Sequence, residues 1–534
     1  MLVRHVAISA LLLFLLSACG MFEYGAATNT RSRLAAPEKA IQTGFAVRTQ
    51  RDTTGCGEGG YADPKKNKDV LVLLALSGGG SRAAYFSAQT MFEMQGIELK
   101  IGDAKSDLLH EVDVISSVSG GSLPAAYYAV SHDPGTSCSV HTNKSWTRDE
   151  VLKLMSLDFR SRWFGRWFWP TNIAAYWFTK FDRTDIMAQT LADKLFDQPI
   201  TGFDLTFSRL NPLRPNLILN ATTGIDDESS GIRFGEVFTF TNEDFTRICS
   251  SIENYSIARG VMATAAFPGV FNFMTLRNYC SNNAPGKPKG ARYLHLFDGG
   301  NADNLGLTSL KRVIWSSLRS RDTQPVLPYK HVIIISVDAF INFHSIDPES
   351  SDPRGAFDFI MDRNFVDATD CLLESNRRQL LAEFEEGRAN LFPFGLGSDS
   401  RSNKKCREFF HDTGDREKYC GKSPVYWKEL NAAINEKLTF IHLSFDSVGD
   451  VKGCMNEFKD PDCLRQQLNH IRTDFRIGGW MRHKGTGLTD VEAIDCAVPT
   501  LFGKEGRMCG NLTPKASVDI NEKWQRVKEI LEAR

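Results

Sequence analysis

A serine stands where an apolar segment stops and a run of small residues begins. Residues 112–118 are mainly β-branched and apolar, Ser119, Gly120 and Gly121 follow, and residues 123–130 are rich in Ala and Tyr. This order predicts a strand that turns sharply into a buried helix, with the serine at the corner. Glycine tolerates positive φ, and a helix N-terminus favours negative charge beside the hydroxyl. The stretch predicts either a nucleophile elbow or an ordinary strand-to-helix turn with a capping serine.

A second junction of strand and helix lies one crossover unit earlier. In residues 69–76, Asp69 is followed by a continuous apolar run, which is typical of a strand buried on both faces in a parallel sheet. Gly78, Gly79 and Gly80 follow, and residues 83–94 are compatible with a helix, so the loop presents amides to an anion. The pattern fits neither G-x-G-x-x-G nor a P-loop. It indicates an oxyanion hole beside the elbow or, alternatively, a plain flexible βα loop.

An aspartate follows a third strand-like run. Residues 294–298 end in Asp298, and two glycines come directly after it. A strand end of this kind places a carboxylate in a loop where another residue can approach closely. The alternative is that Asp298 caps a helix predicted over residues 307–318, for which Asp303 or Asn304 is better placed.

These segments together resemble the three signatures of the patatin-like phospholipases. The quoted residues are Gly78-Gly79-Gly80-Ser81-Arg82, Ser117-Val118-Ser119-Gly120-Gly121 and Phe297-Asp298-Gly299-Gly300, with an Ala-rich block over residues 263–273 ahead of the aspartate. The resemblance covers roughly residues 70–338. It implies an α/β fold of three layers with a mainly parallel central sheet, and a C-terminal helical and loop elaboration beyond it. It also implies a catalytic dyad in which Asp298 accepts the proton of Ser119 and later activates water.

The resemblance further implies an oxyanion hole made by four glycine amides, those of Gly78, Gly79, Gly80 and Gly120. Arg82 either binds a lipid phosphate, which a bidentate guanidinium suits, or holds the loop, or forms an ordinary salt bridge. Ser77 and Ser117 stand where family members usually have Asp and Gly. The Ser-Gly-Gly-Gly-x-Arg-Ala form that begins at Ser77, and Ser119-Gly120 after Val118, resemble the related cytosolic phospholipase A branch. A triad with one of the 11 histidines is not excluded by count. We expect no metal and no other cofactor.

The N-terminus predicts export and lipidation. An apolar run over residues 6–16 is too short to span a bilayer but suits the core of a signal peptide. It ends in Leu16-Ser17-Ala18-Cys19, which resembles the lipobox of bacterial lipoproteins and implies acylation of Cys19 after cleavage. The alternative is a plain secretory signal cleaved after Ala18. Gly20 resembles lipoproteins sorted to the outer membrane, so we expect a lipid-anchored protein of the bacterial cell envelope.

The cysteine count fits an exported protein. Of the 12 cysteines, 11 remain when Cys19 is set aside, and an oxidising compartment favours disulfides. The spacing suggests near pairs: Cys249/Cys280, Cys406/Cys420, Cys454/Cys463 and Cys496/Cys509. Cys56/Cys138 is a candidate for a longer-range bridge, which leaves Cys371 as the odd, buried thiol. The sequence has no C-x-x-C motif and no Cys/His cluster with zinc spacing, so structural cysteines are favoured over metal ligands.

Two further segments are distinctive. Residues 159–181 interleave aromatic and basic side chains, which suits either an interfacial surface or core packing. From about residue 356 the composition changes, with one or two helices over 357–384 and a loop-like stretch over 399–423. A helix and strand over 427–445 are expected to return to the sheet, and residues 519–531 to form an amphipathic helix.

The predicted organisation is a signal peptide over residues 1–18, a tether over 19–65, a catalytic domain over 66–345 and an extension over 346–534 packed on it. A net charge of -1 gives no support for a nucleic-acid partner. Two functions remain. The first is a membrane-anchored acyl-ester hydrolase acting on phospholipid or lysophospholipid, and the second is a non-catalytic lipoprotein that binds lipid or an envelope partner.

Overall fold

A mixed eight-stranded sheet forms the centre of the molecule, with the order β12-β11-β2-β5-β6-β10-β9 and β7 paired to β6. The computed structural model describes these residues: 28–31, 43–47, 69–101, 104–134, 142–197, 204–227, 230–280, 290–341, 363–385, 387–394, 400–411, 413–454, 462–471, 476–478, 481–504, 509–514 and 518–533. The predicted signal peptide, Cys19 and most of the predicted tether lie outside them.

The sheet is mainly parallel, as predicted. Its five parallel strands are β12 (Leu438–Ser444), β11 (His331–Asp338), β2 (Val70–Leu76), β5 (Val114–Val118) and β6 (Asn216–Thr223). The antiparallel strands at the other side are β10 (Tyr293–Asp298), β9 (Met274–Arg277) and β7 (Val237–Thr239). The carboxyl ends of β2 and β5 therefore meet at one edge, which brings the glycine loop to the predicted elbow.

Two apolar cores cover the two faces of the sheet. Every residue of β2 is buried, and alternate side chains along it enter different cores. One core includes helices α2 (Gly80–Gln95), α3 (Ser122–Val130), α7 (Arg183–Leu191) and α9 (Ile257–Thr264). The other includes α11 (Leu307–Ser317) and α15 (Pro424–Asn435). This is the predicted three-layer α/β arrangement, and it explains why the strand runs are continuously apolar.

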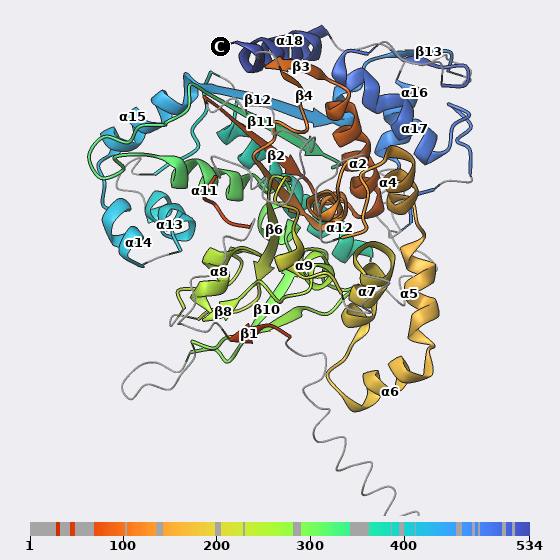
Figure 1. Ribbon diagram of the computed structural model, residues 1–534, viewed down its shortest axis with the longest axis horizontal. Coiled ribbons are helices and arrows are strands. Elements are labelled where there is room, and N and C mark those ends of the chain that lie inside the picture. Colours follow the sequence, from red (N-terminus) through yellow and green to blue (C-terminus); the bar gives the residue numbers. More distant parts are fainter. Residues whose placement is uncertain are drawn as a thin grey trace, which may run out of the picture.

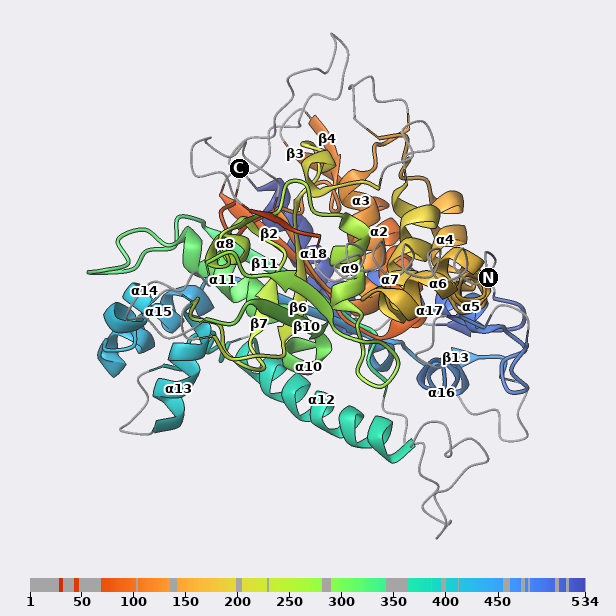
Figure 2. The same ribbon diagram turned by 90° about the horizontal axis from the view of Figure 1, so that it is seen from below.

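The C-terminal part of the chain divides over both faces of the sheet (Figures 1 and 2). Helices α13 (Ser400–Phe409), α14 (Thr413–Tyr419) and α15 gather on one side, and α16 (Cys463–Asn469), α17 (Asp490–Ala497) and α18 (Val518–Glu532) on the other. The strand expected within residues 427–445 is β12, and it completes the sheet beside β11. The division of the chain at residue 345 stays a prediction.

The prediction of a loop-like stretch over residues 399–423 is wrong, because this stretch forms α13 and α14. Their polar sequence hid the few large side chains that hold them. Phe409, Phe410 and Tyr419 are buried, and the Cys406–Cys420 disulfide joins α13 to the residue directly after α14. A small number of anchors thus folds a segment whose average composition is typical of a loop.

Four of the proposed disulfides are present, namely Cys249–Cys280, Cys406–Cys420, Cys454–Cys463 and Cys496–Cys509. Cys56 and Cys138 lie outside the described residues. The expectation of a buried Cys371 is wrong: its thiol is free and exposed on α12 (Arg363–Glu383). The reason is that α12 runs over the surface at this point, where the next residue, Leu372, is exposed as well.

The remaining α-helices and strands lie outside the central sheet and the helices named above. They are the helices α4 (Arg148–Met155), α5 (Phe159–Trp167), α6 (Pro170–Phe178), α8 (Asn242–Arg247) and α10 (Gly300–Asp303), and the strands β1 (Thr30–Arg31), β3 (Glu98–Ile101), β4 (Ala104–Asp107), β8 (Ser250–Ser251), β13 (Val451–Lys452) and β14 (Thr513–Pro514). Among the described residues, no helix combines the length and apolar character needed to cross a bilayer.

Candidate active site

The sharp turn predicted at Ser119 is present. Strand β5 ends at Val118, a 3₁₀ turn spans Ser119–Gly121, and helix α3 begins at Ser122. Ser119 has φ of 47°, a left-handed conformation that a non-glycine residue adopts only when the surrounding structure enforces it. The backbone therefore holds this side chain in a strained position at the junction of strand and helix, as a nucleophile elbow requires.

Asp298 lies in direct contact with this serine. The Ser119 hydroxyl donates a hydrogen bond of 2.9 Å to Oδ2 of Asp298, across 179 residues of sequence. Both residues are nearly buried, with 8% of Ser119 and 5% of Asp298 exposed. The carboxylate is thus placed to receive the hydroxyl proton without an intermediary.

Burial raises the pKa of the Asp298 carboxyl to about 6, although hydrogen bonds from the Gly300 amide and from Ser119 act in the opposite direction. Removal from water disfavours the charged form of a carboxyl group. A base with a pKa near 6 is ionised at neutral pH, yet it binds a proton more readily than an exposed aspartate does. This combination suits a group that takes up and returns one proton.

Backbone hydrogen bonds fix the aspartate loop. The amide of Asp298 donates to the carbonyl of Ala266 at 3.0 Å, and that of Gly299 to the carbonyl of Thr264 at 3.0 Å. The Thr222 hydroxyl of β6 donates to the carbonyl of Asp298 at 2.8 Å. The Ala-rich block and β6 therefore hold the carboxylate rigidly beneath the serine. Asp298 does not cap α11, since Asp303 accepts the amides of Leu305, Gly306 and Thr308.

The glycine loop packs directly against the elbow. A Cβ on Gly120 would lie 2.0 Å from the carbonyl oxygen of Gly80, and one on Gly78 would lie 3.2 Å from Cβ of Ser119. Gly79 and Gly80 have φ of 137° and 59°, values that favour glycine. Glycine is required here because the two segments approach more closely than any side chain allows.

The four predicted oxyanion donors differ in availability. The amide of Gly78 donates to the carbonyl of Asn304 at 3.0 Å, so that group is already engaged. Gly79 precedes α2 and Gly80 is its first residue, where amides lack an acceptor within the helix. Gly120 directly follows the serine. The candidate donors of the oxyanion hole are therefore the amides of Gly79, Gly80 and Gly120.

Arg82 faces the protein interior. It is nearly buried, and its guanidinium donates to the carbonyl of Ala339 at 2.8 Å and to that of Ile471 at 2.6 Å. A Cβ on Gly79 would lie 3.2 Å from its Nη2 atom. These contacts favour the loop-holding alternative over the binding of a lipid phosphate.

Two asparagines belong to the site although the sequence analysis did not single them out for it. Asn220 on β6 donates to the Ser116 hydroxyl at 2.9 Å and to the carbonyl of Ser117 at 2.8 Å, which ties two strands together below the elbow. Asn304 packs against the glycine loop, since a Cβ on Gly78 would lie only 2.3 Å from its Oδ1 atom. For Asn220, the sequence signal was a polar residue in the middle of strand β6. For Asn304, it was a polar residue in the glycine-containing loop that follows Asp298.

Among the described residues, no histidine forms a hydrogen bond with Ser119 or Asp298, so within them no Ser-His-Asp triad is formed. In the same residues, no group of three or more His, Cys, Asp or Glu side chains is arranged to hold a metal ion.

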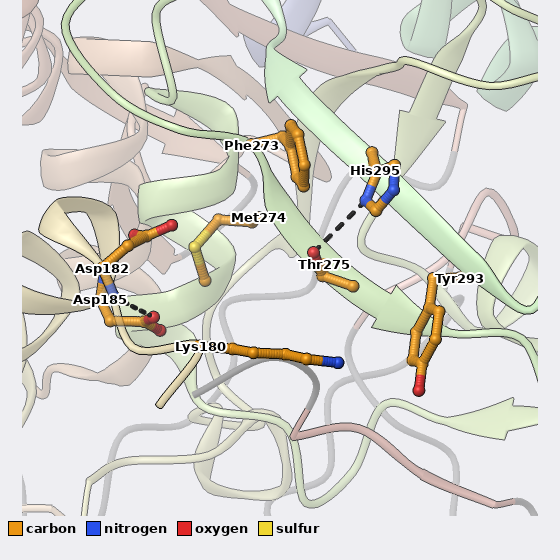
Figure 3. Close-up of a pocket in the computed structure, with 8 residues that line it drawn as sticks. All are labelled: Lys180, Asp182, Asp185, Phe273, Met274, Thr275, Tyr293 and His295. Atoms are coloured by element: carbon orange, nitrogen blue, oxygen red, sulfur yellow. Dashed lines mark hydrogen bonds between the residues drawn. The ribbon is translucent and has the colours of Figure 1, made fainter. Parts of the chain in front are cut away.

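A pocket of about 270 Å³ lies away from this site, between the end of α6 and strands β9 and β10 (Figure 3). Tyr293 and His295 line it, whereas Asp298 belongs to the alternate, buried row of side chains on β10. Lys180 extends across the pocket toward the Tyr293 ring. The pocket is therefore a surface feature on the other face of β10 and does not contain the serine.

Residues 74–311 match the family model described as patatin-like phospholipase. The matched residues include the glycine loop, the elbow and Asp298, so the resemblance drawn from these motifs is confirmed. No curated protein matches the chain.

Solved structures that are similar to the chain include three with a TM-score of 0.22 each. VipD from Legionella pneumophila is 13% identical over 57% of this chain and 55% of VipD. The type III effector protein ExoU is 14% identical over 58% and 53%. Full-length ExoU from the type III secretion system of Pseudomonas aeruginosa, in complex with SpcU, is 14% identical over 66% and 61%. The chain spans between about half and three fifths of the length of these structures.

Proposed function

We propose that this protein, whose residues 74–311 match the patatin-like phospholipase family model, hydrolyses acyl esters of phospholipids or lysophospholipids with a Ser119–Asp298 dyad. The observation that carries the proposal is the hydrogen bond of 2.9 Å between the serine hydroxyl and a buried carboxylate. A serine hydroxyl is a weak nucleophile and needs an adjacent base. Asp298 supplies that base directly.

In the first half of the reaction, Oγ of Ser119 attacks the acyl carbonyl carbon while its proton passes to Asp298. The carbonyl oxygen becomes an oxyanion that accepts hydrogen bonds from the amides of Gly79, Gly80 and Gly120. When the tetrahedral intermediate collapses, the bond to the lipid alcohol breaks, and Asp298 returns the proton to that leaving oxygen. The product is an acyl ester on Ser119.

In the second half, Asp298 takes a proton from a water molecule that attacks the acyl-enzyme carbonyl. The same amides stabilise the second oxyanion, and Ser119 leaves with the proton held by Asp298. A free fatty acid is released and the enzyme returns to its starting state. Losing one oxyanion donor typically costs about 3 kcal/mol of transition-state stabilisation.

The proposal includes a position at a membrane. The lipobox-like residues 16–19 support acylation of Cys19, and several acyl chains together give stable anchoring. Gly20 supports sorting to the outer membrane of a bacterial envelope. Membrane lipid is then the substrate within reach of the tethered domain.

The catalytic test compares the unaltered chain with Ser119→Ala and Asp298→Asn on a short-chain p-nitrophenyl ester and on mixed phospholipids. We expect each substitution to lower kcat/KM at least ~1,000-fold, since nucleophile and base act as one unit. Circular dichroism of all three chains controls for folding. Equal rates in the three folded chains would favour the non-catalytic lipid-binding lipoprotein instead.

The anchoring test is separate. Cells expressing the full chain and its Cys19→Ala variant are labelled with a radioactive fatty acid and fractionated. We expect label in the outer-membrane fraction for the unaltered chain and none for the variant. Equal labelling of both chains would remove Cys19 from the proposal and leave the chemistry of Ser119 untouched.

A further inference from the structure

Helices α5 and α6 expose an unusual concentration of large apolar side chains. Six of the twelve exposed large apolar residues in the described part of the chain lie on this helical pair, which we call the aromatic hairpin (residues 159–178). They are Phe164, Phe168, Trp169, Ile173, Trp177 and Phe178. Phe168 is 75% exposed and Trp177 is 74% exposed. Large apolar side chains that gather on one exposed segment of a folded surface point to an interaction site.

The hairpin is an ordered part of the fold. Trp163 is buried, its ring packs on that of Phe271 at 5.1 Å between centroids, and its indole nitrogen donates to the carbonyl of Arg183 at 2.9 Å. The Asn172 side chain donates to the carbonyl of Arg166 at 3.0 Å and joins α5 to α6. The inner side is therefore fixed to the body, and the aromatic residues are held outward.

The charge of this segment is one-sided. Residues 159–181 contain four basic side chains and no Asp or Glu. Arg162 is exposed, and Arg166 forms an ion pair with Asp193. Aromatic rings at headgroup depth, with arginine and lysine directed to phosphates, are typical of surfaces that lie in a membrane interface. The exposed Arg162, beside the exposed rings, complements an anionic lipid surface.

The chain enters the body at the same end of the molecule. In Figure 1, β1 and α6 both lie at the lower end, below the central sheet. Asn29 donates to the carbonyl of Arg277 in β9, while Trp163 packs on Phe271, just ahead of the same strand. Cys19 precedes Thr28 by nine residues, which span at most about 30 Å when extended. A lipid on Cys19 would hold this end close to the bilayer.

We propose that the aromatic hairpin docks the protein on the surface of a phospholipid bilayer that carries anionic headgroups. The rings of Phe168, Trp169 and Trp177 insert at headgroup depth, and the exposed Arg162 contacts lipid phosphate. Docking deepens the proposed function because it brings the Ser119 site to membrane lipid. It requires neither ester hydrolysis nor acylation of Cys19.

The test measures vesicle binding by the chain from Gly20 onward with Ser119→Ala. This chain keeps every described residue, cannot receive the lipid at position 19 and leaves the vesicles intact. Binding to phosphatidylcholine vesicles, with and without phosphatidylglycerol, is followed by sedimentation. Adding Phe168→Ser, Trp169→Ser and Trp177→Ser together is expected to lower the partition coefficient roughly 100-fold, since binding scales with the apolar area inserted.

A matched control is Val425→Ser, an exposed apolar residue at the start of α15, which Figures 1 and 2 place far from α6. It is expected to bind as the parent does. Arg162→Glu is expected to weaken binding to the phosphatidylglycerol vesicles several-fold and to change binding to phosphatidylcholine less. Thermal unfolding of each chain controls for folding.

Two results would overturn the proposal. One is equal vesicle binding by the parent and the folded triple variant. The other is a parent chain that sediments as a dimer, dissociates in the triple variant and does not bind vesicles, because the hairpin would then join two copies. Since Ser119→Ala is present throughout, failure of the hydrolase proposal leaves these outcomes unchanged.

Discussion

The Ser119–Asp298 site and the aromatic hairpin differ in which kind of side chain they bury and which they expose. At the site, two nearly buried polar side chains face each other, and the glycine loop packs too tightly to admit a Cβ. On the hairpin, rings that would suit a core remain exposed, and Gly165 in α5 has no atom within 4 Å of the position of a Cβ. The Ser119–Asp298 site buries polar side chains, and the aromatic hairpin exposes apolar ones.

The difference shows what each task requires. Catalysis depends on hydrogen-bond partners that are fixed before the reaction, so the site accepts the cost of burying a carboxylate and of a left-handed serine. Docking on a surface depends on apolar area that is still in contact with water before binding. A substitution of the same kind should therefore have different consequences in the two regions.

Glycine to alanine tests this contrast most strongly. Gly120→Ala must displace the backbone of Gly80, and we expect kcat/KM to fall at least ~1,000-fold, or the chain not to fold. Gly165→Ala meets open space inside a helix and should raise the free energy of unfolding by about 0.5–1 kcal/mol. Urea unfolding and ester hydrolysis measure both effects. Similar activities for the two variants would refute the tight approach of loop and elbow.

Tryptophan to alanine tests the two sides of the hairpin. Trp163→Ala removes a buried ring and its hydrogen bond to Arg183, which should lower the free energy of unfolding by about 3–5 kcal/mol. Trp177→Ala removes an exposed ring and should change it by less than about 0.5 kcal/mol. Denaturant titrations in the absence of lipid give both values. A large loss from Trp177→Ala would mean that this ring stabilises the fold, not a docking surface.

The titration of Asp298 gives a smaller effect on stability than Trp163→Ala. Its pKa is about 6 in the folded chain and about 3.9 in an unfolded one. The folded state therefore retains a proton that the unfolded state has lost, and stability from this group is fully present below pH 4 and lost as the pH rises through 6.

Asp298→Asn removes this dependence. We expect the variant to gain about 1–3 kcal/mol over the unaltered chain on going from pH 4 to pH 8, measured by urea unfolding. In the unaltered chain, kcat/KM should rise with pH through about 6, because the base acts as the carboxylate. A stability difference that does not vary with pH, or a kcat/KM that falls through this range, would contradict the assignment of Asp298 as a buried base.

The short-range parts of the site followed from the sequence. A continuous apolar run, a small-residue turn and a serine at its corner constrain the backbone within about ten residues, so β5, the elbow and α3 were predictable. The resemblance to the patatin-like phospholipases implied that Asp298 is the partner of Ser119. The strand, the turn and the helix depend on local backbone conformation, which neighbouring residue types largely decide.

Tertiary structure alone decided which side chains are exposed and which polar groups already have a hydrogen-bond partner. The amide of Gly78 is engaged by Asn304, and Arg82 turns inward to the carbonyls of Ala339 and Ile471. Cys371 is exposed, and the rings of the aromatic hairpin divide between a buried Trp163 and an exposed outer side. Burial and hydrogen-bond pairing depend on segments up to hundreds of residues apart, and no local pattern specifies which of those segments will be neighbours.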